Sequence, residues 1–120
     1  MINKIVILLL TLRNQIKIYH WQTKLYARHK ASDMLVEKID ELLDKYVETY
    51  QGLHPNLILD DKNNNIDLMN IDDMKITAYL QTIRELFITE IRDIKESELL
   101  NIRDDILQII DQTLYLFKLE

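Results

Sequence analysis

Two pairs of side chains with metal-binding chemistry lie on one predicted helix. His29 and Asp33 are four residues apart, and so are Asp44 and Glu48. Residues four apart lie on the same face of an α-helix, one turn apart, so each pair can offer two ligands to one metal ion. The sequence therefore predicts a metal site in which the reacting residues are His29, Asp33, Asp44 and Glu48.

One chain does not bring the two pairs together. Asp44 follows Asp33 by eleven residues, which is about 16 Å along a helix axis. If two copies of the helix pack antiparallel about a two-fold axis near Lys38 and Ile39, the first pair of one copy meets the second pair of the other. We therefore expect a homodimer or a larger oligomer, with two equivalent sites between subunits.

The ligand types narrow the choice of metal. The chain has no Cys, which removes thiolate ligands and thiol nucleophiles together. Imidazole and carboxylate ligands without thiolates suit iron, manganese or zinc, which we rank in that order from ligand type. Iron is the expected metal, in a mononuclear or di-iron arrangement, and zinc or manganese are the alternatives.

A simpler explanation is a solvated helix face. On a helical wheel the acids and His29 fall within an arc of roughly 100° that does not face the apolar stripe. We call this set the acidic ridge: His29, Asp33, Glu37, Asp40, Asp44 and Glu48. Lys30, Lys38 and Lys45 lie between these acids and are available for salt bridges between subunits. The alternative function is therefore a non-enzymatic assembly protein that uses the ridge for subunit contacts.

Four helices are predicted to carry these residues. Apolar residues recur at steps of three and four over about 3–23, 28–51, 70–94 and 98–119. The second helix should end at Gly52 and Pro55, the chain's one Gly and one Pro. Asn70 is the predicted N-cap of the third helix, and Ser97 with Glu98 predicts the break before the fourth.

The long segment between the second and third helices points to the fold. Residues 53–70 are mostly polar and read as a connection that is long enough to cross a bundle. Two pairs of helices with short loops and one long connection are typical of ferritin-type bundles. We expect an all-α chain in which residues 1–120 form a single ferritin-like four-helix-bundle domain, and an ordinary helical bundle is the alternative.

The ligand pairs resemble those of the Dps proteins, the starvation-protection branch of the ferritin-like family. That family's second helix carries His, three residues, Asp, ten residues, Asp, three residues and Glu, which matches His29, Asp33, Asp44 and Glu48. The family also has a His-Trp pair near the end of the first helix, where this chain has His20-Trp21. The resemblance implies that His20 is a further metal ligand. It also implies an intersubunit ferroxidase site that oxidises and sequesters Fe(II), in a dimer that can close into a dodecameric cage.

Two features depart from these families. His29 follows His20 by nine residues, three fewer than is usual in Dps proteins, so the first loop must be shorter. The role of His20 is therefore less secure than that of His29, and the alternative is a core histidine that bonds a backbone carbonyl. No Glu-x-x-His motif occurs, unlike in ferritins whose di-iron site lies within one bundle.

The strings at 19–24, 101–105 and 113–117 also resemble ferritin-like proteins of large DNA viruses, which implies a virion or a virus-infected cell.

Charge and hydropathy limit the partners. The net charge is −5 and no Lys-rich tail is present, whereas nucleic-acid binding rests on clustered Lys and Arg. The apolar run at 5–10 is too short to span a bilayer and no cleavage signal follows it. We therefore expect an intracellular, cytoplasmic protein that binds Fe(II) and itself, without nucleic acid or membrane.

Overall fold

The computed structural model describes residues 2–119, which form four helices and a long crossover. The helices are α1 (Ile2–Gln22), α2 (Tyr26–Leu53), α3 (Ile76–Ile91) and α4 (Ser97–Leu116). The described residues contain no strand, and none of their helices is long and apolar enough to cross a membrane. The prediction of an all-α four-helix bundle is confirmed.

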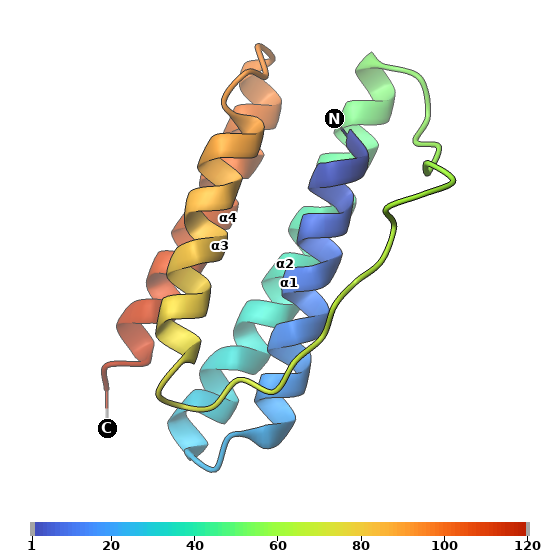
Figure 1. Cartoon of the computed structure of the whole chain (residues 1–120). Helices are drawn as coiled ribbons and strands as arrows, with labels where there is room; N and C mark the ends of the chain where they lie inside the picture. Colours follow the sequence, from blue (N-terminus) through green and yellow to red (C-terminus); the bar gives the residue numbers. More distant parts are fainter. Residues whose placement is uncertain (1, 120) are drawn as a thin grey trace.

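The connectivity is that of a ferritin-type bundle. Figure 1 shows α1 and α2 as an antiparallel hairpin, after which the chain returns along the whole length of the bundle before α3 begins. As a result α3 runs parallel to α2, and α4 runs antiparallel to both. Each helix packs against two neighbours: α1 against α2 and α3, and α4 against α2 and α3.

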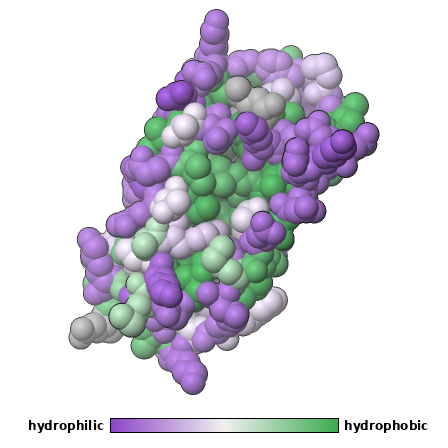
Figure 2. Space-filling view, in the orientation of Figure 1, coloured by the Kyte–Doolittle hydropathy of each residue, from purple (hydrophilic) through white to green (hydrophobic). Residues whose placement is uncertain are grey.

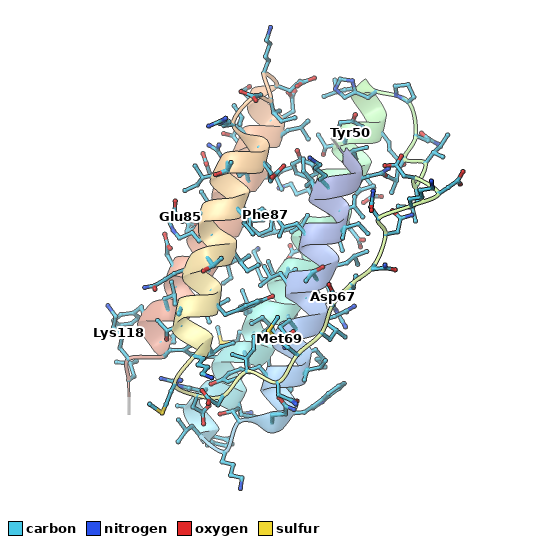
Figure 3. All side chains as sticks on the ribbon, in the orientation of Figure 1. Tyr50, Asp67, Met69, Glu85, Phe87 and Lys118 are labelled. Atoms are coloured by element: carbon cyan, nitrogen blue, oxygen red, sulfur yellow. The ribbon has the colours of Figure 1, made fainter. Side chains whose placement is uncertain are left out.

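The four helices share one apolar core. The repeats at steps of three and four place apolar side chains on the inward side of each helix, because that spacing keeps them on one face. Figure 3 illustrates this on α3, where Phe87 points into the bundle and Glu85 points away from it. The fully buried side chains include Ile5, Leu9, Leu12, Ile16, Leu35, Ile39, Tyr46, Ile76, Leu80, Ile106 and Ile110.

A buried glutamine of α1 fastens the crossover. The Gln15 side chain is 1 % exposed, its Nε2 donates to the carbonyl of Met69 at 2.6 Å, and its Oε1 accepts from the Met69 amide at 3.0 Å. Figure 3 shows Met69 on the segment that passes in front of α1 and α2. Closer to the start of α3, Gln22 Nε2 donates to Asn70 Oδ1 at 2.7 Å. These bonds fix the path of an otherwise exposed segment.

Helix α3 begins later than the sequence predicted. The predicted N-cap, Asn70, is wrong, because its side chain accepts the hydrogen bond from Gln22 instead of capping a helix. Asp72 stabilises the turn before α3 instead, because its Oδ1 accepts from the backbone amides of Met74 and Lys75, both at 3.0 Å. That turn leads into α3 at Ile76. At the other end α3 stops at Ile91, before the predicted 94, and a turn follows.

An apolar groove lies between α1 and α3 beneath the crossover. Figure 2 shows hydrophobic residues gathered in the middle of this face, with polar residues around them. The groove has a volume of about 470 Å³ and its apolar wall is formed by Ile7, Leu8, Ile83 and Leu86. The groove lies on a different side of α1 from the surface that packs against α2. Helix α2 carries the predicted metal ligands other than His20.

Candidate metal centre

A link of three residues brings His20 and His29 together. Helix α1 ends at Gln22 and α2 begins at Tyr26. Within the link, the amide of Thr23 donates to the carbonyl of Tyr19 at 2.8 Å, and the hydroxyl of Thr23 accepts from the amide of Leu25 at 3.2 Å. The hairpin is therefore tight enough for the last turn of α1 to face the first turn of α2 across a nine-residue spacing.

The two imidazole rings stack and fix each other. Their centroids are 3.8 Å apart at an interplanar angle of 18°. His20 Nδ1 donates to the carbonyl of His29 at 2.7 Å, and His29 Nδ1 donates to the carbonyl of His20 at 2.8 Å. Because a carbonyl oxygen only accepts, each Nδ1 carries the hydrogen in the neutral ring. In this tautomer the lone pair lies on Nε2, and this is the form of the ring that binds a metal.

Asp33 adds a carboxylate beside this pair. Its Oδ1 lies 3.9 Å from His20 Nε2, and its side chain is 57 % exposed, whereas His20 is nearly buried. Lys17 also approaches this oxygen, with Nζ at 3.8 Å. The structure thus brings three of the predicted ligands, His20, His29 and Asp33, to one end of the α1–α2 hairpin. We call these three residues the histidine half-site.

Asp44 and Glu48 are not brought to the histidine half-site. Both are exposed on the same unbroken helix, and among the described residues neither makes an ion pair or a side-chain hydrogen bond. From Asp33 to Asp44 the helix rises by about 16 Å. No group of three or more His, Asp or Glu side chains within residues 2–119 is close enough to hold a metal ion. The predicted metal site would therefore have to take its remaining ligands from a second copy of the chain.

Another acid of the ridge has a structural partner. Arg13 of α1 donates from Nε to Asp40 Oδ1 at 2.9 Å and from Nη2 to Oδ2 at 3.4 Å, so the pair joins α1 to α2 in a two-pronged contact. Both side chains are partly exposed, at 33 % and 49 %. A bridge of this kind contributes about 0.2–1 kcal/mol. Asp40 therefore belongs to helix packing more than to the candidate site.

A polar network that the sequence did not predict closes the same end of the bundle. Buried Tyr19 donates to Asp73 Oδ1 at 2.6 Å, and Thr23 donates to the same oxygen at 2.7 Å. Arg28 donates to the carbonyl of Asp73 at 2.5 Å and to that of Phe117 at 3.2 Å. The partners lie at least 45 residues apart along the chain. No local pattern signals such a contact.

Charge and burial shift the pKa values in this network. Burial and the hydrogen bond to Asp73 raise the pKa of Tyr19. Partial burial pushes the pKa of Asp73 upward, but the hydrogen bonds from Tyr19 and Thr23 and the charge of Arg28 outweigh it and hold that pKa below its usual range. Asp73 is therefore ionised at neutral pH and ties the start of α3 to the α1–α2 hairpin.

The third histidine lies at the opposite end of the bundle. His54, just after α2, places Nε2 2.7 Å from Glu96 Oε1, and its ring is 4.5 Å from that of Tyr50. A backbone hydrogen bond within Glu96 and the hydrogen bond with His54 lower the pKa of the Glu96 carboxyl. The contact joins the end of α2 to the start of α4. It is a helix-end contact and has no part in the histidine half-site.

The comparisons with known proteins give a family without an assigned function. Residues 20–117 match the model of DUF5856, described as a family of unknown function. A stretch of 33 residues is 48 % identical to an uncharacterized 14.6 kDa protein of Enterobacteria phage T4. That stretch covers 28 % of this chain and 26 % of the phage protein, so it spans about a quarter of the relative. No solved structure matches. Since the family match takes in most of the chain, from His20 onward, the protein belongs to DUF5856.

Proposed function

We propose that the protein binds Fe(II) between two copies of α2 and promotes its oxidation. The observation that carries the proposal is the histidine half-site, where reciprocal Nδ1 hydrogen bonds leave Nε2 of His20 and His29 free to coordinate. Held imidazoles with a neighbouring carboxylate are the donor set that suits iron in the absence of thiolates. Asp33 supplies that carboxylate from the same end of the hairpin.

A second copy of the chain would supply the remaining ligands. Antiparallel packing of two α2 helices brings Asp44 and Glu48 of one copy toward the histidine half-site of the other. At the level of the expected axis Lys38 is partly exposed, whereas Ile39 is fully buried in the chain's own core. Lys38 is therefore the residue of the two that would lie at the surface where the copies meet.

Exposed apolar side chains around the half-site support such an interface. Trp21 is 68 % exposed, Tyr26 72 % and Met34 51 %. Trp21 follows His20 and Met34 follows Asp33, and the Tyr26 ring lies 6.5 Å from that of His29. Aromatic residues and Met are enriched where protein surfaces meet, and exposed apolar groups that cluster mark contact surfaces. Covering them with a second copy would remove apolar area from water at the place where the ligand pairs must meet.

In this proposal iron is the substrate. The acids of the ridge attract the divalent cation, and the imidazole and carboxylate groups hold it as it changes charge. Two Fe(II) ions give up one electron each, and one hydrogen peroxide takes up both electrons and two protons to become two water molecules. Retention of the Fe(III) product would sequester the metal. Since a relative is a phage protein, we place this activity in a virus-infected cell or a virion.

Non-enzymatic assembly is the second candidate function. The observation that favours it is that two ridge acids already have cationic partners, Asp40 with Arg13 and Asp33 with Lys17. On that view the ridge would serve ion pairs within and between subunits, without any metal. A measurement of metal binding distinguishes the two functions, because only the first requires a metal.

Substitution of Asp44 tests the proposal. Asp44→Ala should weaken Fe(II) binding, measured by anaerobic calorimetry, and should slow Fe(II) oxidation, measured by the absorbance of the ferric product. Glu41→Ala is the control, because it also removes one exposed carboxylate from α2 but lies off the ridge; unlike Asp44, Glu41 has a cationic partner, Lys38, at 3.4 Å. Both changes should alter the free energy of unfolding by no more than about 0.5 kcal/mol. Equal Fe(II) affinities for the parent, Asp44→Ala and Glu41→Ala would favour the assembly function.

A further inference from the structure

Lys17 stands where a metal cation would approach Asp33. Its Nζ lies 3.8 Å from Asp33 Oδ1, the same oxygen that lies 3.9 Å from His20 Nε2. Lys17 is on α1, one turn before His20, and its side chain is 28 % exposed. The ammonium group is therefore a cation built into the histidine half-site, and it neutralises the one carboxylate that the half-site contains.

We propose that Lys17 acts as an internal competitor for the metal, which must displace the ammonium group from Asp33 before binding there. This inference rests on the proposed function and adds a residue that sets metal affinity. An ammonium and a divalent cation beside the same carboxylate repel each other, so Lys17 raises the metal concentration needed to fill the site.

The Lys17 ammonium has a second partner next to it, the ring of Trp21. Lys17 Nζ is 5.7 Å from the centroid of the Trp21 ring, and the two residues are four apart on α1. A Lys ammonium within about 6 Å of an indole face is attracted to it. Lys17 thus lies between a carboxylate and an aromatic face. If a metal ion displaces the ammonium from Asp33, the ammonium keeps its contact with the Trp21 ring, so its charge is not left without a partner.

The same geometry supplies an optical signal. Trp21 is the chain's only tryptophan, and the ammonium near its ring changes its surroundings when it moves. Emission from Trp21 should therefore respond when Lys17 moves, and also when a second copy covers Trp21. A metal ion that bound elsewhere on the chain would leave Lys17 beside Asp33 and the emission unchanged.

The test compares Zn(II) binding by the full-length parent and three variants. Lys17→Met removes the charge and keeps a flexible apolar stem, Lys17→Arg keeps the charge, and Lys4→Met removes one charge from α1 about 20 Å away. Repulsion between two unit charges 4 Å apart lowers an affinity about fivefold even in water, and a divalent ion doubles the repulsive energy. We expect Lys17→Met to bind Zn(II) about fivefold or more tightly, and Lys17→Arg and Lys4→Met to stay near the parent.

Trp21 emission is the second readout. In the parent it should change with the same midpoint as Zn(II) binding, and in Lys17→Met that midpoint should fall to a lower Zn(II) concentration together with binding. Equal Zn(II) affinity of Lys17→Met and the parent would overturn the inference while leaving the proposed function in place. Absence of Zn(II) binding by all four proteins would overturn the proposed function and this inference with it.

Discussion

At the scale of single residues, the candidate site depends on which nitrogen of each histidine is free. Nδ1 of each of the two histidines, His20 and His29, donates to the backbone carbonyl of the other. Backbone carbonyls, and not carboxylates, therefore fix both tautomers. A ring held in this way needs no reorientation to bind a cation through Nε2. The arrangement depends on the three-residue link, because a longer one would let the two rings separate.

The network around Asp73 gives a pH-dependent prediction. The folded pKa of Asp73 is lowered, so its stabilising contribution is present above the unfolded pKa of about 3.9 and is lost as the pH falls through the folded pKa. Asp73→Asn should therefore reduce the free energy of unfolding at pH 7, by about 1 kcal/mol for the weakened hydrogen bonds. The difference from the parent should shrink as the pH falls below about 4.

Urea denaturation at a series of pH values measures this difference. Asp61→Asn is the control, since Asp61 is exposed on the crossover and its change should leave stability unaltered at every pH. A difference between the parent and Asp73→Asn that stayed constant from pH 7 down to about pH 2 would contradict the role given to the Asp73 carboxylate.

At the scale of elements, the crossover determines the fold. It holds α3 parallel to α2 and so makes the bundle ferritin-type, yet it contributes few buried side chains of its own. Its most buried attachment is the pair of hydrogen bonds between the Gln15 side chain and the backbone of Met69. A buried polar side chain inside an apolar stripe is costly unless such partners exist.

Gln15→Leu should test this attachment. The change removes both hydrogen bonds to the Met69 backbone, and two such bonds together contribute about 1–3 kcal/mol. We therefore expect the free energy of unfolding to fall by about that amount in urea denaturation. Gln22→Ala, which removes the exposed bond to Asn70, should cost less than about 0.5 kcal/mol. Equal costs for the two variants would show that the Gln15 contact does not fasten the crossover.

Sequence periodicity was sufficient for the helices and their inward faces. The stripe from Ile5 to Tyr19 is buried as predicted, and the first two helices begin and end close to their predicted limits, because a helix end with Gly52 and Pro55 nearby has strong local signals. The start of α3 was predicted wrongly. Asn70 has the chemistry of an N-cap, but its partner is Gln22, 48 residues earlier in the chain. A contact between distant residues decided that boundary.

The same distinction holds for the candidate site. The spacing of His29, Asp33, Asp44 and Glu48 can be read from one helix, and the metal roles of these residues remain predictions. The stacking on His20 and the approach of Lys17 to Asp33 depend on how α1 packs against α2. Side-chain contacts between helices leave no periodic trace in the sequence, so neither could be predicted.

At the scale of the whole molecule, the central question is how two copies meet. Antiparallel packing of the acidic ridge places carboxylates of one copy near carboxylates of the other, which repel in the absence of a cation. A metal that binds between them would offset this repulsion and stabilise the pair of chains by mass action. The proposed metal site and the proposed dimer are therefore one hypothesis, and a test should address both together.

Complementation between two inactive variants provides that test. The first, His29→Ala with Asp33→Ala, lacks the first ligand pair, and the second, Asp44→Ala with Glu48→Ala, lacks the other. Each alone should bind no Fe(II) at the ridge. In a mixed dimer one of the two sites recovers all its ligands, while the other loses both pairs.

The measurement is the Fe(II) stoichiometry of the two variants produced together in one cell, compared with each produced alone and with the parent. If chains pair at random, half of the dimers are mixed and each has one intact site, so binding should return to about a quarter of the parental stoichiometry. A coexpressed sample that binds no more Fe(II) than the separate variants would contradict a site shared between two copies of α2.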